Sequence, residues 1–211
     1  MTNREKEQFC LFAAAMVAPP DAALLHDLQQ EELRGRLRTY AEIWGAEPEL
    51  LSPFFQQSDQ QDFISLIQSE YVRLFAQYEG ESISLAESTY KPWTKDKSCG
   101  MVFAASKGLL LGDCAIHMLD LYRQLSIEIP DEFQSQPDHL VLELEFLAML
   151  YQSGSDEQTR QFIKDHLDWL PDLKREVKEA DARPFYRNGI ELIHLFLESE
   201  DKNRGKVIAH G

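Results

Sequence analysis

The chain has 211 residues, of which 44% are hydrophobic and 27% are charged. A chain of this length can bury a sizeable apolar core, so neither disulfides nor a metal ion are needed to hold it together. With 36 acidic and 21 basic residues the formal net charge is −15. This argues against nucleic acid and stable insertion into an anionic membrane, because phosphate binding depends on clustered lysine and arginine.

The N-terminal part of the sequence is typical of helices. Residues 5–17 are predicted to form a buried first helix rather than a secretory leader, because acidic residues cancel the basic ones before the apolar run. An apolar stripe from Leu33 to Trp44 predicts a second helix. A third helix is expected to end at Gly80. Its stripe, the clearest in the chain, consists of Phe63, Ile67, Tyr71, Leu74, Phe75 and Tyr78.

Loops and shorter helices are expected in the middle of the chain. Residues 81–98 are polar and predict a long loop, and the pattern that follows predicts helices at about 99–110 and 113–126. Residues 127–137 predict a second loop. Pro137 is expected in the first turn of the next helix, where its missing N–H has no cost.

The C-terminal part continues the helical pattern. Ser155 and Gln158 form a capping-box pair, which predicts a helix start there and an end near Leu170. A short helix at 172–181 and a final helix from Pro184 to Glu198 are expected to follow, with 199–211 frayed.

These elements predict an all-α fold, a single bundle of roughly nine or ten helices, since no stretch alternates with the period of a strand. Residues 1–126 form the N-terminal part and residues 138–211 the C-terminal part. The loop at 127–137 is the candidate hinge between them.

Most catalytic patterns are absent from the sequence, including a phosphate loop and zinc-protease motifs. One Glu-x-x-His pair occurs, Glu191 and His194, whereas bundles that bind two irons use two such pairs and further glutamates. No metal site is therefore expected, although a metal- or ligand-binding helical enzyme using these residues stays an alternative. The odd count of three cysteines indicates free thiols in a reducing cytoplasm.

Three segments carry a family resemblance. They are Glu70-Tyr71-Val72-Arg73-Leu74-Phe75, Glu87-Ser88-Thr89-Tyr90-Lys91-Pro92-Trp93, and Pro137-Asp138-His139-Leu140 followed by Glu143-Leu144-Glu145-Phe146-Leu147. An aromatic-x-x-Leu-Phe helix, a Glu-Ser-x-Tyr loop and a Pro-Asp-His helix start resemble, in this order, the TorD/DmsD family. These proteins are chaperones of molybdenum-cofactor oxidoreductases and are related to the NarJ-type chaperones. The resemblance is strongest over residues 60–150.

The resemblance implies a cytoplasmic, non-enzymatic chaperone. Such a protein binds the twin-arginine signal peptide of an apo molybdenum-cofactor oxidoreductase and holds it until cofactor insertion and folding are complete. No cofactor is expected, because guanine-nucleotide binding, attributed to some members, has no phosphate loop to support it here. Members also exchange domains, so a monomer and a domain-swapped dimer are both open.

The resemblance also implies peptide-binding residues. Those that match its motifs are Tyr71, Leu74, Phe75, Glu87, Ser88, Tyr90, Pro137, Asp138 and His139, and Pro92 and Trp93 adjoin the second motif. The aromatic and leucine side chains suit an apolar groove, and Glu87 and Asp138 suit arginine. As an alternative, the same residues belong to the core, with Glu87, Ser88 and Tyr90 bracing a loop. A further alternative is a helical adaptor unrelated to export.

Overall fold

The computed structural model describes residues 1–55, 60–76 and 82–208, so Tyr78 and Gly80 of the predicted third helix lie outside the described residues. Within these ranges the chain forms nine α-helices and no strand, which confirms the all-α prediction. The helices are α1 (Asn3–Val17), α2 (Ala22–Gln29), α3 (Glu31–Trp44), α4 (Gln60–Phe75), α5 (Asp113–Leu125), α6 (Leu140–Ser153), α7 (Asp156–His166), α8 (Leu170–Glu179) and α9 (Pro184–Ile208). Three short 3-10 helices, η1 (Pro48–Phe54), η2 (Glu87–Thr89) and η3 (Asp131–Phe133), complete the set.

Local sequence signals explain where several helices begin and end. Thr2 and Glu5 form a capping box at the start of α1, and Ser155 and Gln158 form the predicted one at the start of α7. Gly45 ends α3 with φ of 70°, a left-handed conformation that glycine adopts without steric cost.

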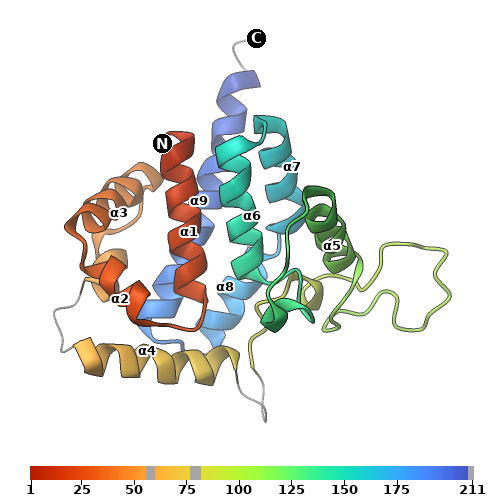
Figure 1. The fold of residues 1–211 in the computed structure, drawn as a ribbon, viewed down its shortest axis with the longest axis horizontal. Coiled ribbons are helices and arrows are strands. Elements are labelled where there is room, and N and C mark those ends of the chain that lie inside the picture. The colour runs from red at the N-terminus through yellow and green to blue at the C-terminus, as the bar shows by residue number, and fades with distance from the viewer. Residues whose placement is uncertain (56–59, 77–81, 209–211) are drawn as a thin grey trace.

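The centre of the molecule is a pair of neighbouring helices, α1 and α6, with α9 packed against α1 (Figure 1). Helix α6 is buried nearly all round, which is typical of a central helix. One core cluster contains residues of both the 1–126 and the 138–211 parts. The hinge at 127–137 stays a prediction. None of the helices in the described ranges combines the length and apolarity needed to cross a bilayer.

The predicted helix at 99–110 was wrong. This segment consists of turns, and Figure 1 shows the connection that leads into α5 extending away from the helical body. Its apolar residues have no core to pack on, since Val102 is fully exposed. Gly108 is left-handed, and the amides of Trp93 and Thr94 donate to carbonyl groups at 106 and 104. The segment therefore pairs with the loop before it.

The helix ends also differ from the predictions in three places. Helix α6 begins at Leu140 with His139 as its N-cap, so Pro137 lies before the first turn. Helix α7 ends at His166, and α8 begins at Leu170, two residues before the expected start at 172.

The fraying predicted from residue 199 onward is wrong for the described part, because α9 continues to Ile208. Glu200 accepts bonds from Lys6 at 2.7 Å and Tyr151 at 2.9 Å. These contacts tie the end of α9 to α1 and α6.

Candidate functional site

The second and third motifs meet in space although about fifty residues separate them. Ala86 and His139 form an isolated antiparallel bridge. The Glu87 amide donates to the Asp138 carbonyl at 3.0 Å, and the Leu140 amide donates to the Leu85 carbonyl at 2.8 Å. The Glu-Ser-x-Tyr loop is therefore fixed to the start of α6.

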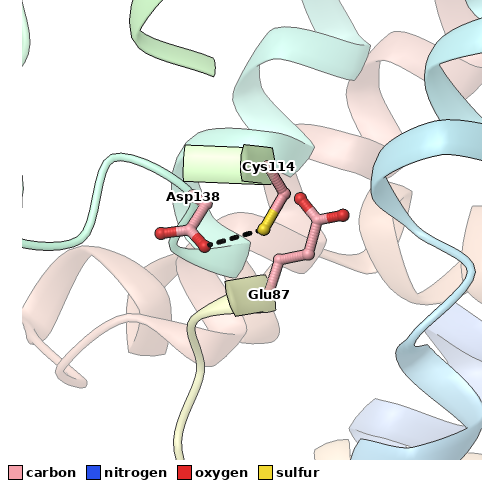
Figure 2. Close-up of side chains that lie close together, drawn as sticks. All are labelled: Glu87, Cys114 and Asp138. Atoms are coloured by element: carbon pink, nitrogen blue, oxygen red, sulfur yellow. Dashed lines mark hydrogen bonds between the residues drawn. The ribbon is translucent and has the colours of Figure 1, made fainter. Parts of the chain in front are cut away.

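Asp138 lies inside this junction with no exposed surface. Its Oδ2 accepts a hydrogen bond from the Ser88 amide at 2.6 Å, and the Cys114 Sγ lies 3.7 Å from the same oxygen. Figure 2 shows the Asp138 carboxylate directed at the Cys114 sulfur, with Glu87 beside Cys114. Burial raises the pKa of Asp138 against the effect of the Ser88 bonds.

Glu87 is equally buried, but neighbouring groups stabilise its negative charge. Its Oε2 lies 2.8 Å from the His166 Nδ1, and Lys91 forms an ion pair with its other oxygen. Burial opposes ionisation, but His166 and Lys91 outweigh it and lower the pKa of Glu87. Lys91 also binds Asp168 at 2.5 Å and the Asp165 carbonyl at 2.7 Å.

Glu143 is a second buried carboxyl group beside Glu87. Burial and the neighbouring negative charge of Glu87 raise its pKa well above the ordinary value. The Trp169 indole donates to its Oε2 at 3.2 Å. The pKa values of the neighbouring Glu87 and Glu143 carboxyl groups therefore shift in opposite directions.

His139 caps α6 and is almost fully buried. Its Nδ1 accepts a bond from the Val141 amide at 3.2 Å. Burial lowers the pKa of His139 to about 4, so the ring is neutral near pH 7.

Tyr90 braces its loop against α8. Its hydroxyl lies 2.9 Å from the Ser84 carbonyl and 2.8 Å from a Glu176 carboxylate oxygen, and its ring stacks on Trp169 at 4.8 Å. Burial raises the pKa of Tyr90 further above neutrality. These contacts agree with the alternative in which the Glu-Ser-x-Tyr segment braces a loop.

The first motif forms a separate aromatic cluster with α9. Leu74 is buried, whereas Tyr71 and Phe75 are half-buried and pack against Tyr186 at 6.2 and 5.5 Å between ring centroids. One backbone bond, from the Ile83 amide to the Leu74 carbonyl at 2.8 Å, connects this cluster to the Glu-Ser-x-Tyr loop.

A pocket of about 210 Å³ lies beside the junction of the second and third motifs. It is lined by Lys91, Pro92, Lys95, Asp113, Cys114, His117, Asp165 and His166. Trp93 is half-buried and packs on Phe103 at 5.1 Å. The carboxyl groups of Glu87 and Asp138 lie inside the protein rather than at the rim of a groove.

Sequence reasoning missed the residues that complete the junction. Glu143 stood in a quoted motif without a role, although an acid at helical spacing from Leu140 and Leu147 is a signal of a buried carboxyl group. Cys114 and His166 come from α5 and α7 and carry no local pattern.

The Glu-x-x-His pair lies outside this network. Glu191 pairs with Lys174 at 2.8 Å, and His194 lies 3.3 Å from Glu198. Neither residue belongs to the groups of potential metal ligands found in the described ranges. Both half-buried side chains are thus engaged in ion pairs or hydrogen bonds at the periphery of α9.

Comparisons with known proteins identify the family of the chain. The sequence profile of the nitrate reductase delta subunit family matches residues 28–175. The chaperone protein TorD of Shewanella pealeana is 26% identical over 187 residues, which are 85% of this chain and 80% of that protein. A selenate reductase assembly chaperone of Thauera selenatis is 33% identical over 78 residues, which are 31% of this chain and 40% of that protein.

A solved structure has the same fold. It is a putative redox enzyme maturation protein from Archaeoglobus fulgidus, with a TM-score of 0.58, 20% identity, and coverage of 92% of this chain and 93% of that one. The family comprises chaperones and maturation proteins rather than catalysts. The resemblance to TorD is thus confirmed, and the chain belongs to the nitrate reductase delta subunit family.

Proposed function

We propose that this protein is a cytoplasmic chaperone for a molybdenum-cofactor oxidoreductase. It binds the twin-arginine signal peptide of the apo-enzyme and prevents export until the cofactor is inserted and the enzyme is folded. The broader role, maturation of a redox enzyme, rests on the family and on relatives named as chaperones. The signal peptide and the client class rest on the motifs and on the geometry described above.

The observation that carries this proposal is the junction of the Glu-Ser-x-Tyr loop with the Pro-Asp-His segment beside a pocket. The Asp138–Ser88 bond and the Ala86–His139 bridge fix the loop from inside. Pro92 and Trp93, which follow it, are half-buried and accessible. A rigid loop that presents apolar side chains suits recognition of an apolar peptide segment at low entropic cost.

The candidate residues divide into two roles by exposure. The accessible ones, proposed to contact the peptide, are Tyr71, Phe75, Pro92 and Trp93. The buried ones, proposed to hold these in place, are Leu74, Glu87, Ser88, Tyr90, Pro137, Asp138 and His139.

Charge supports a basic partner. Residues 131–170 contain nine acidic and two basic residues; seven of the acids lie outside the buried pair Asp138 and Glu143, and one of these seven, Asp165, lines the pocket. The negative field favours encounter with the basic start of a signal peptide. Carboxylates bind arginine through paired, charge-assisted hydrogen bonds.

The direct test is calorimetric titration with a peptide that carries two adjacent arginines and an apolar stretch. Trp93→Ala is expected to weaken binding about tenfold or more, because an aromatic side chain at an interface centre contributes ~1.4 kcal/mol or more. Phe55→Ala is the matched control, since Phe55 is a half-buried aromatic residue beside Arg34 and Arg38. Its affinity should equal that of the wild type.

A second titration tests whether the peptide arginines bind carboxylates of the protein. Replacing both peptide arginines by lysine should lower affinity, because lysine cannot bind a carboxylate through two parallel bonds. Absence of binding to the wild-type protein, or equal affinities for wild type and Trp93→Ala, contradicts the proposal. Recovery of a large twin-arginine oxidoreductase subunit in a native pull-down supports it, and recovery of unrelated proteins alone favours a general adaptor.

A further inference from the structure

Glu87, Cys114 and Asp138 bring three potential metal ligands together from separate parts of the chain. Figure 2 shows the Asp138 carboxylate directed toward the Cys114 sulfur, with Glu87 beside Cys114. These residues come from the segment before α6, the start of α5 and η2. One ligand atom of each lies within 4.8 Å of those of the other two. Ligand atoms around a tetrahedral zinc ion lie roughly 3.3–3.8 Å apart. Small side-chain movements therefore suffice to close this set around an ion.

The surrounding contacts already orient these ligands. His166 binds one oxygen of Glu87, and the Ser88 amide binds one oxygen of Asp138. Hydrogen bonds to the ligating carboxylates are the usual supporting shell of a protein metal site. Glu87, Glu143 and His166 form a second set of ligand atoms within the same 4.8 Å limit. Glu87 thus belongs to both sets of potential metal ligands.

An independent observation is that, in the described part of the chain, two buried carboxyl oxygens of this cluster lack a hydrogen-bond partner. Asp138 Oδ1 and Glu143 Oε1 are buried and have no hydrogen-bond partner among the described residues. Both side chains have no exposed surface. An unpaired buried polar group costs about 1–3 kcal/mol. Lys91 compensates Glu87, and no lysine or arginine of the described ranges pairs with Asp138 or Glu143.

A route from solvent to this cluster exists. Cys114 and His166 belong to the cluster and also line the pocket of about 210 Å³. The pocket has room for water, which a site with three protein ligands uses as its fourth ligand. An ion can therefore reach Cys114 without opening the core.

We propose that Glu87, Cys114 and Asp138 bind one divalent ion of the zinc class. A thiolate selects zinc over magnesium or calcium, which prefer oxygen ligands only. On binding, the thiol proton of Cys114 and any proton on Asp138 leave to solvent, and no electrons are transferred. This inference goes beyond the proposed function, and its test uses no peptide.

The test adds zinc alone to the metal-free full chain, and cobalt as its spectroscopic substitute. The wild type is expected to bind one equivalent and to develop a thiolate-to-cobalt absorption band. Cys114→Ser should lose that band and bind zinc at least about tenfold more weakly. Cys99→Ser is the matched control, because Cys99 lies outside the cluster and should bind zinc like the wild type.

A measurement on the wild type covers the case in which Cys114→Ser fails to fold. Zinc should slow alkylation of Cys114, located by mass spectrometry, and leave the rate at Cys99 unchanged. Lack of saturable zinc binding, an unchanged band in a folded Cys114→Ser variant, or equal alkylation of Cys114 with and without zinc overturns the proposal. Each of these results leaves the peptide titration intact as a test of the chaperone role.

Discussion

At the scale of single residues, the buried carboxyl groups define this protein. Glu87, Asp138 and Glu143 have no exposed surface, yet the pKa of Glu87 is lowered and those of Asp138 and Glu143 are raised, because their neighbours differ. Lys91 and His166 keep Glu87 ionised, whereas burial favours the neutral form of Asp138 and Glu143. The polar groups of the family motifs therefore fix the loop to α6.

Glu70 offers a separate test at this scale. Arg73 donates to its two oxygens at 2.9 and 2.7 Å, and the Arg183 amide donates at 2.8 Å. Glu70→Gln is expected to lower the free energy of unfolding by about 1.5–3 kcal/mol at pH 7, the range for hydrogen bonds to a charged group. Urea unfolding measures this change.

The difference in the free energy of unfolding between wild type and Glu70→Gln is expected to depend on pH. The hydrogen bonds from Arg73 lower the pKa of Glu70 below 4.5 against the effect of burial. The ionised group thus stabilises the fold fully above pH ~4.5, and this contribution is lost as the pH falls through the lowered pKa. The gap between wild type and Glu70→Gln should narrow below pH ~4.5. Glu179→Gln, at an exposed pair with Arg175, should change stability by less than about 0.5 kcal/mol.

At the scale of helices, the sequence predicted those elements whose position depends on residues close together in the chain. The apolar stripe of α3 and the capping box of α7 both depend on neighbours in sequence, and both predictions were confirmed. The segment at 99–110 failed because apolar residues predict a helix only when a core is available to bury them. The prediction of fraying after residue 198 was wrong because Lys6 and Tyr151, which are distant in sequence, bind Glu200 of α9.

The cap of α7 is testable by itself. Ser155→Ala removes the acceptor of the Gln158 amide, which lies at 3.2 Å, and leaves a helix N–H without its partner. The expected loss in the free energy of unfolding is about 1 kcal/mol. Ser65→Ala, at an exposed position within α4, is the control and should change stability by less than about 0.5 kcal/mol. Equal losses for both variants would contradict a capping role.

At the scale of the whole molecule, the decisive feature is the meeting of two segments about fifty residues apart. The motifs singled out Glu87 and Asp138 as candidates, but no local pattern shows that these two residues lie inside the protein. Cys114 and His166 join them from α5 and α7 by tertiary packing alone. The net charge of −15 favours a basic partner, and the region proposed to bind the peptide adjoins the pocket beside this junction.

Hydrogen–deuterium exchange with and without a twin-arginine peptide tests this account most directly. Peptide addition is expected to slow exchange in residues 84–95, 113–117 and 136–141, which surround the pocket and the junction. Unchanged exchange in these three segments under saturating peptide, or protection confined to α2 and α3, would contradict it.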